Sequence, residues 1–125
     1  MQIPEDLLYT KDHEWIKIEG EKATIGITDF AQSQLGDIVY LEIETLDQSL
    51  ERQDIFGTVE AVKTVSDLYM PISGTVIKVN EDLNDSPETV NSDPYGDGWL
   101  IQIRIDGAAD SELLNAAEYA SEIGE

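Results

Sequence analysis

The chain of 125 residues contains no cysteine and only one histidine, His13. Without cysteine it can form no disulfide bond, and it offers no thiolate as a nucleophile or metal ligand. A single histidine also excludes a metal site built from several histidines. We therefore expect no metal site and no thiol chemistry from the side chains of this protein.

Basic residues are scarce, with seven Lys and Arg against 27 Asp and Glu and a formal net charge of -20. Such a surface repels phosphate groups, so we expect no nucleic-acid partner. Two explanations of the acidity stay open. It can attract basic faces of protein partners with salt-sensitive rates, or it can simply keep an abundant protein in solution.

Long apolar runs are absent as well. None approaches the roughly 20 residues that a membrane-spanning helix requires, and the first residues lack the pattern of a secretory signal or an arginine-rich transit peptide. We expect a cytoplasmic protein without a membrane partner, or a mitochondrial matrix protein if a transit peptide has been removed. The length and the hydrophobic content of 41% are typical of one compact domain spanning residues 1–125, and we expect a monomer.

Alternation of apolar and polar residues predicts several strands. It is clearest over residues 99–106 and recurs over 22–27 and 39–44, where Val39, Leu41 and Ile43 fall on one side. Residues 75–79 are β-branched except for Lys78, which also favours a strand. The pattern therefore predicts a mainly β domain.

Short helices are predicted at the periphery. Thr28 or Asp29 can cap a helix that runs to Leu35 and ends at Gly36. A C-terminal helix is predicted from about residue 110 to 123, with Asp110 as its cap and with an apolar stripe made by Leu113, Ala116, Ala117 and Ala120. Residues 80–98 contain two prolines and two glycines and are predicted to form an ordered loop.

The most informative stretch runs from Gly57 to Gly74 and has Lys63 near its centre. Two strand-like runs flank Lys63, so a hairpin turn would expose it. Val62 and Thr64, on either side, are β-branched and should stiffen this apex. An exposed lysine at a loop tip is ordinary by itself, because loops collect charged residues.

From Val59 to Gly74 the chain closely resembles the lipoylation site of the glycine cleavage system H protein family, whose signature reads Val-Glu-Ser/Ala-Val-Lys-x-x-Ser-Asp-Leu-Tyr-x-Pro-x-Ser-Gly. Further blocks resemble the family's opening strand, the start of its first helix and two later segments; they span residues 9–15, 25–32, 35–39 and 90–100. The resemblance covers nearly the whole chain. It implies a lipoyl/biotinyl-domain-like flattened barrel-sandwich with short peripheral helices and a C-terminal helix.

The resemblance also implies a function. Lys63 would bear lipoic acid as an amide, and the arm would take the aminomethyl group of glycine from a pyridoxal-phosphate glycine decarboxylase to a tetrahydrofolate-dependent aminomethyltransferase. Dihydrolipoamide dehydrogenase would reoxidise it, and a lipoate-attaching enzyme would load it. The chain would be a cofactor carrier and not an enzyme, since no nucleophile, base and orienting group can be assembled from its sequence.

The family resemblance further implies that the loaded arm folds back into a cleft. A carboxylate is the natural partner of its ammonium group, with Glu14 as the first candidate and Asp67 as the second. The alternative for Glu14 is an ordinary solvated strand carboxylate. Glu60 and Asp67 flank the apex and are candidates for recognition by the attaching enzyme, while His13 is expected to be a structural residue or to lie at the edge of the cleft.

Other carriers fit less well. Biotin carriers usually place methionine on both sides of the lysine, and lipoyl domains of 2-oxo acid dehydrogenases usually have Asp-Lys-Ala, whereas Val62 and Thr64 stand here. Two alternatives stay open at this point: an H-like protein that mainly relays lipoate to other enzymes, and an acidic interaction module that is no carrier.

Overall fold

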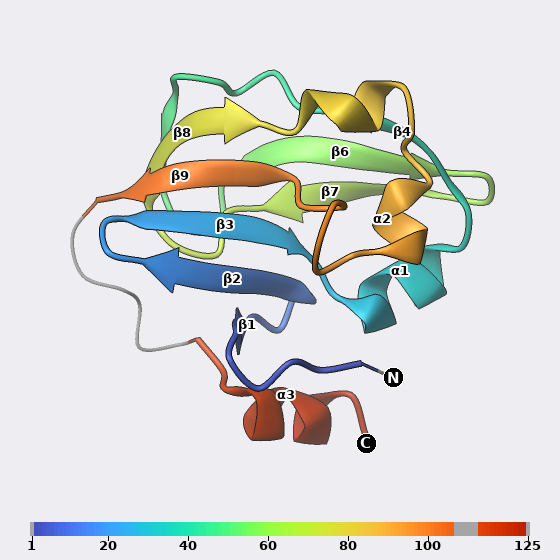
Figure 1. Cartoon of the computed structure of the whole chain (residues 1–125), viewed down its shortest axis with the longest axis horizontal. Coiled ribbons are helices and arrows are strands. Elements are labelled where there is room, and N and C mark those ends of the chain that lie inside the picture. Colours follow the sequence, from blue (N-terminus) through green and yellow to red (C-terminus); the bar gives the residue numbers. More distant parts are fainter. Residues whose placement is uncertain (1, 107–112, 125) are drawn as a thin grey trace.

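Two antiparallel sheets face each other in the computed structural model, which describes residues 2–106 and 113–124 (Figure 1). The larger sheet has the strand order β1-β2-β3-β9-β8-β5, and the smaller has the order β4-β6-β7. Short helices lie around them. The mainly β fold with peripheral helices and a C-terminal helix is confirmed.

The strands of the larger sheet are β1 (Leu8–Tyr9), β2 (Glu14–Glu19), β3 (Lys22–Ile27), β9 (Ile101–Ile105), β8 (Gly74–Val79) and β5 (Ser49–Leu50). Those of the smaller sheet are β4 (Ile38–Glu42), β6 (Ile55–Ala61) and β7 (Val65–Tyr69). The helices are α1 (Asp29–Leu35), a 3-10 helix η1 (Glu81–Asn84), α2 (Thr89–Ser92) and α3 (Ala116–Glu122).

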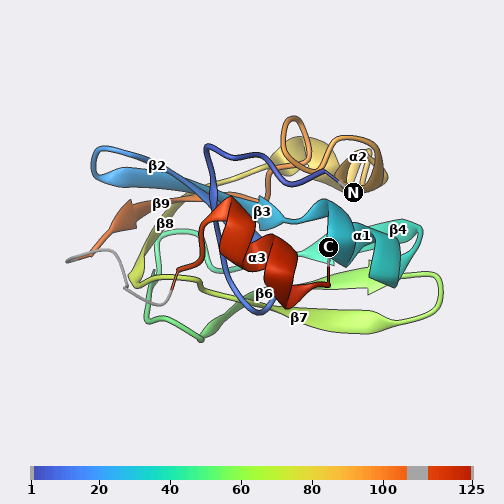
Figure 2. The same cartoon turned by 90° about the horizontal axis from the view of Figure 1, so that it is seen from below.

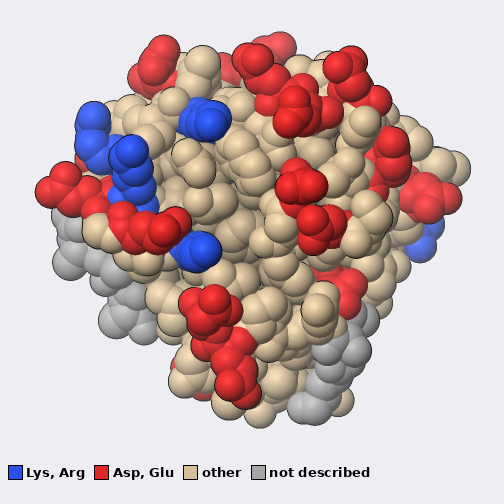
Figure 3. All heavy atoms as spheres, in the orientation of Figure 1, with Lys and Arg blue, Asp and Glu red and all other residues tan. Residues whose placement is uncertain are grey.

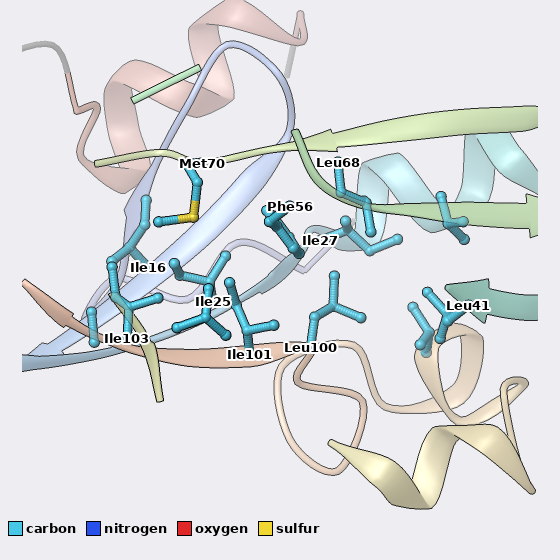
Figure 4. Close-up of a cluster of buried hydrophobic side chains, with 14 of the residues drawn as sticks. Ile16, Ile25, Ile27, Leu41, Phe56, Leu68, Met70, Leu100, Ile101 and Ile103 are labelled. Atoms are coloured by element: carbon cyan, nitrogen blue, oxygen red, sulfur yellow. The ribbon is translucent and has the colours of Figure 1, made fainter. Parts of the chain in front are cut away.

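The core fills the space between the two sheets. Ile25 and Ile101 are register partners on β3 and β9, and they face Phe56 and Leu68 from the smaller sheet (Figure 4). All four side chains are buried. Each contributes about 1.5–3 kcal/mol through burial, so the alternation seen in the sequence corresponds to the main source of stability.

One predicted face is wrong. Val39 was expected to share the buried side of its strand with Leu41, but it is 49% exposed while Leu41 is buried. The pairing of β4 with β6 shifts between Ile38 and Tyr40, as in a β-bulge. Because the bulge adds a residue to one strand only, it moves Val39 off the inward side.

The expected opening strand, residues 9–15, is in fact a strand, a turn and the start of a second strand. The chain reverses between Tyr9 and Glu14, and the Thr10 backbone N–H donates to the Glu14 carbonyl (3.0 Å). His13 occupies this turn with a φ of 66°. The Thr10 hydroxyl accepts from the N–H of Asp12 (3.2 Å) and of Glu14 (3.3 Å), which stabilises the reversal.

The C-terminal helix starts later than predicted. Helix α3 begins after Asn115, whose side chain accepts from the Glu118 N–H while the Glu118 carboxylate accepts from the Asn115 N–H. This capping box fixes the start of the helix. Leu114 forms a β-bridge with Tyr9 instead of joining the helix, and Asp110, the predicted cap, lies outside the described residues.

Helix α3 packs beside β1 at one edge of the molecule (Figure 1) and lies in front of the strands when the molecule is seen from that side (Figure 2). The ring of Tyr119 stacks on that of Tyr9, with 4.7 Å between ring centroids and 10° between planes. The predicted loop of residues 80–98 contains η1 and α2, with Val90 fully buried. Within the described part of the chain, no helix is both long and apolar enough to span a membrane.

Replacing Gly26 with alanine should lower the free energy of unfolding by about 2 kcal/mol, because overpacking forces a neighbour to move. Gly26 lies opposite Trp15 in the β2–β3 pair, and a Cβ there would lie 2.6 Å from the indole ring. Urea denaturation measures the effect. Lys22→Ala, at the exposed start of the same strand, is the control and should shift stability by less than about 0.5 kcal/mol.

Candidate functional site

Lys63 lies at the exposed tip of the β6–β7 hairpin, as the sequence predicts. Three residues, Val62 to Thr64, connect the two strands, and the Ala61 N–H donates to the Thr64 carbonyl across the base of the turn (2.8 Å). Val62 is 76% exposed. The hairpin extends beyond the other strands (Figure 1), so an enzyme can reach the lysine from solvent.

The backbone beneath Lys63 is held in place by the segment between α1 and β4. The Val62 N–H donates to the Asp37 carbonyl (3.0 Å). Gly36 ends α1 with a φ of 79°, and a Cβ added there would lie 3.4 Å from Cε of Lys63. The sequence predicted Gly36 as a helix terminator, and its positive φ fits that role, while a Cβ there would make only an ordinary contact with the lysine stem.

Asn91 of α2 holds this segment from the other side. Its amide donates to the Gly36 carbonyl (2.8 Å) and to the Gln32 side chain (3.0 Å), and its oxygen accepts from the Ile38 N–H (2.9 Å). Asn91 is half-buried, and its side-chain amide uses both its donors and its acceptor. Such a fully bonded polar group stabilises the positions of the groups that it binds. The apex therefore rests on a rigid base, although Lys63 itself is exposed.

Glu14 is buried, with 2% of its surface exposed, so its reading as a solvated strand carboxylate is wrong. Its Oε2 accepts from the Tyr69 N–H (2.9 Å), and its Oε1 accepts from the Thr10 hydroxyl (3.2 Å). Tyr69 belongs to β7, an edge strand of the smaller sheet. Glu14 thus joins the two sheets at an edge that would otherwise leave an N–H unpaired.

Burial raises the pKa of Glu14 to about 8, because removal from water disfavours the charged form. The hydrogen bonds from Tyr69 and Thr10 act in the opposite direction, and the charge of Asp12 adds to the increase. Near neutral pH this carboxyl group is therefore mostly protonated. A nearby cation would favour its ionised form.

Asp67 and Glu60 are both exposed and lie on the hairpin itself. Asp67 pairs with Thr58, and Glu60 pairs with Val65. Strand β7 runs from the apex back toward Glu14, and a rise of about 3.4 Å per residue places Tyr69 about 14 Å beyond Val65. Asp67 lies midway along this path. The structure thus places Lys63 in the turn before β7, Asp67 within β7 and the Glu14 carboxyl of β2 at the far end of β7, and it does not gather them in one cluster.

His13 contacts the C-terminal helix. Its Nδ1 lies 2.9 Å from the Tyr119 hydroxyl, which also lies 2.7 Å from Oγ1 of Thr28, and its ring packs on Phe30. Burial lowers the pKa of His13 and raises that of Tyr119 to about 12, so the phenol keeps its proton. Tyr119 is 106 residues away from His13, and no sequence pattern links the two.

A hollow of about 710 Å³ opens beside the turn that carries Glu14. Thr10, Asp12, Arg52 and Gln53 contribute to its lining, and the Gln53 amide donates to the Asp12 carboxylate (3.1 Å). The sequence offered no signal for this hollow. Residues 2–106 and 113–124 contain no group of three or more His, Asp or Glu side chains arranged to hold a metal ion.

The glycine cleavage H-protein family model matches residues 7–125. The chain belongs to the glycine cleavage H-protein family. It is 57% identical over 128 residues to the glycine cleavage system H protein of Chlorobium limicola, with full coverage of both chains. It is 55% identical over 123 residues to that of Salinibacter ruber, covering 98% of this chain and 99% of the other.

A solved structure supports the same membership. The crystal structure of a glycine cleavage system H protein from Mycobacterium marinum superposes with a TM-score of 0.90 at 41% identity, covering 98% of this chain and 100% of that chain. The flattened barrel-sandwich expected from the resemblance to the H-protein family is therefore confirmed.

Glu14→Gln should remove a pH dependence of stability. A folded-state pKa of about 8 against an ordinary value of 4.5 means that the contribution of Glu14 is fully present below about pH 4.5 and is lost as the pH rises through about 8. The stability of Glu14→Gln relative to the unchanged chain should therefore rise between pH 5 and pH 9. Urea denaturation at both values measures this, with Glu19→Gln, an exposed carboxyl on β2, as the control. Parallel pH profiles for all three proteins would contradict the ionisation cost at Glu14.

Proposed function

We propose that this chain is the lipoyl carrier of a glycine cleavage system and that Lys63 is its attachment site. The observation that carries the proposal is the exposed lysine on a three-residue turn whose backbone is fixed by Asp37. Attachment requires an amine that an enzyme can reach at a defined position. When bound, the lipoyl group supplies the disulfide that accepts the aminomethyl group of glycine.

In the attachment reaction the protein holds the amine of Lys63 at a defined position and keeps it accessible to the attaching enzyme. Nζ of Lys63 attacks an activated lipoyl donor, the amide bond forms as the bond to the leaving group breaks, and the positive charge departs as a proton. The hydrogen bond from the Val62 N–H to the Asp37 carbonyl holds the backbone of the apex, while the Lys63 side chain is exposed. Val62 and Val65 present apolar surface on either side of it.

The partners we propose are glycine decarboxylase, aminomethyltransferase, dihydrolipoamide dehydrogenase and a lipoate-attaching enzyme. All of them act on the side chain of Lys63. The carrier itself supplies no catalytic group, and we expect it to act in the cytoplasm, or in the mitochondrial matrix if a transit peptide has been removed. His13 is proposed as a structural residue, because its imidazole contacts the Tyr119 hydroxyl.

Glu14 and Asp67 are the proposed partners of the cargo's ammonium group. Asp67 lies part of the way along β7, and the Glu14 carboxyl lies at its end, at Tyr69, in a buried position. An arriving ammonium would drive Glu14 to its ionised form, with release of a proton to solvent and formation of a charge-assisted hydrogen bond. The same burial that raises the pKa of Glu14 would then strengthen this pair.

Lipoylation of Lys63 can be tested by mass spectrometry of the protein isolated from its native cells. The modified lysine resists trypsin, so one peptide from Gln53 to Lys78 bearing the lipoyl mass should appear. Lys63→Arg, expressed in the same cells, should be unmodified. Complete tryptic cleavage after Lys63 in the native protein would overturn the carrier assignment.

Loss of the Glu14 charge should speed the escape of the aminomethyl group from the loaded chain. We expect Glu14→Ala to shorten its lifetime about tenfold or more, because a hydrogen bond to a charged group is worth about 1.5–3 kcal/mol. Glu14→Gln keeps an acceptor for Tyr69 and separates the charge effect from a packing effect. Release of formaldehyde and ammonia from the isolated loaded carrier measures the rate.

Glu60→Gln is the matched control, because Glu60 is an exposed carboxylate on the same hairpin and pairs with Val65 next to the apex, at the end of β7 away from Tyr69. Its lifetime should equal that of the unchanged chain. Asp67→Asn should have a smaller effect than Glu14→Gln. Equal lifetimes for all four variants would exclude Glu14 and Asp67 as partners of the cargo.

A further inference from the structure

The turn that carries Lys63 is held by a peptide group outside the hairpin. The Val62 N–H donates to the Asp37 carbonyl (3.0 Å), in the segment that connects α1 to β4. We name residues 36–38 the apex support. The conformation of the apex support therefore decides where the backbone next to Lys63 is held.

Asn91 of α2 binds the same peptide group from its other end. Its Oδ1 accepts from the Ile38 N–H (2.9 Å), and this N–H belongs to the peptide unit whose carbonyl is that of Asp37. Because a peptide unit is planar and trans, its N–H and C=O point in opposite directions, and a partner that holds the N–H also orients the carbonyl. The link from Asn91 to Val62 thus runs through one rigid group.

The side-chain nitrogen of Asn91 fixes the start of the apex support and ties it to α1. It donates to the Gly36 carbonyl (2.8 Å) and to Oε1 of Gln32 (3.0 Å). Gln32 in turn donates to Oδ1 of Asp29 (2.8 Å), in the first turn of α1. Figures 1 and 2 show both helices at the end of the molecule that the tip of the hairpin also occupies.

Helix α2 is anchored in the core of the protein. Val90, next to Asn91, is fully buried and belongs to the core cluster that also contains Ile38. Pro94, just beyond the helix, is buried, and its carbonyl accepts from the indole N–H of Trp15 (2.9 Å). The position of Asn91 is therefore set by the core and does not follow the hairpin.

We propose that Asn91 is a positioning residue for lipoate attachment. It orients the peptide group of residues 37–38 and thereby presents the Lys63 turn to the attaching enzyme at one place. The lysine side chain cannot define that place, because its four-carbon stem is flexible and exposed. The inference rests on the proposed carrier function and deepens it, since it names a residue outside the hairpin on which attachment depends.

A turn that loses this support occupies the presented position for a smaller part of the time. The apparent affinity of a partner falls with the fraction of molecules in the competent state, while the steps after binding are unchanged. Loss of the Asn91 amide should therefore raise the KM of the attaching enzyme for the chain and leave kcat unchanged.

The test compares Asn91→Ala with Asn80→Ala. Asn80 is a buried amide that also donates to two carbonyls, those of Asp97 (2.9 Å) and Trp99 (2.8 Å), and neither belongs to the apex support. Both changes leave the net charge unchanged. Charge has to be kept constant because Figure 3 shows acidic side chains over η1 and around α2, where Asn91→Asp would add another.

The probe is the purified lipoate-attaching enzyme of the same organism with its lipoyl donor, and intact mass measures the rate on unmodified chain. We expect Asn91→Ala to raise KM about fivefold with kcat unchanged, and Asn80→Ala to leave both unchanged. Thermal unfolding checks that all proteins are folded at the assay temperature. Equal KM values for the two alanine variants would overturn the inference. If Asn91→Ala does not fold, Asn91→Ser takes its place, because one hydroxyl cannot replace two donors and an acceptor.

Amide hydrogen exchange measures the mechanical link directly. In Asn91→Ala the Val62 N–H should exchange about tenfold faster, because its acceptor is no longer held. The Ala61 N–H, which donates to the Thr64 carbonyl within the hairpin (2.8 Å), should exchange as before and is the internal control. Unchanged exchange at Val62 would show that Asn91 does not position the turn.

A small acylating reagent separates presentation of the amine from its reactivity. Lys63 is exposed, so acetylation of its amine by N-hydroxysuccinimide acetate should be equally fast in the unchanged chain and in Asn91→Ala. Tryptic mass spectrometry measures the rate at this lysine. Slower acetylation in Asn91→Ala would place the effect in the amine itself and overturn the positioning role.

Failure of this inference and failure of the carrier function are distinguishable. If the enzyme lipoylates the unchanged chain and both alanine variants with the same KM, the carrier function stands and the role of Asn91 is wrong. If the enzyme does not lipoylate the unchanged chain at Lys63, the carrier function is wrong, and the inference that rests on it falls with it.

Discussion

The hydrogen bond from the Tyr69 N–H to the Glu14 carboxyl joins the two sheets at the free edge of β7. An unpaired N–H in that position would cost about 1–3 kcal/mol of folding free energy. It would also leave a free backbone donor at the edge of the smaller sheet, where another chain could pair with it. The same carboxyl group fixes the Thr10 turn, which places His13 against Tyr119 of α3. One buried side chain thus connects the hairpin, the N-terminal turn and the C-terminal helix.

The apex shows the opposite arrangement, a rigid backbone with an unpacked side chain. The Asp37 carbonyl holds the turn by accepting from the Val62 N–H, and the Lys63 side chain is exposed. A carrier needs both properties, because the enzyme must find the amine at a fixed point and the finished arm must then move between sites. A buried Lys63 could not move between active sites. A longer loop would allow the amine to occupy many positions, because the conformational freedom of a loop grows with its length.

Local features of the fold were predictable from the sequence, and non-local ones were not. Thr28 and Gly36 bound α1 through contacts within a few residues, and the hairpin around Lys63 follows from a contiguous signature. Val39 was predicted on the wrong side of its strand, because the β-bulge depends on pairing with β6 and leaves no signal in the segment itself. Leu114 was misplaced because Tyr9, far away in the sequence, draws it into a bridge. Glu14 was singled out from the family resemblance, but its burial depends on Tyr69 and could not be read from its own segment.

The exposed carboxylates and the buried carboxyl of Glu14 differ in their electrostatic behaviour. Charges on the outer surface act over distances of about a Debye length, which is about 8 Å at physiological ionic strength. Glu14, taken out of water, is mostly neutral at pH 7, because burial raises its pKa to about 8. A carboxylate left exposed there would bind a cation weakly, because water screens the pair. Burial therefore separates one acidic residue of 27 from the surface charge and gives it the two hydrogen bonds that join the sheets.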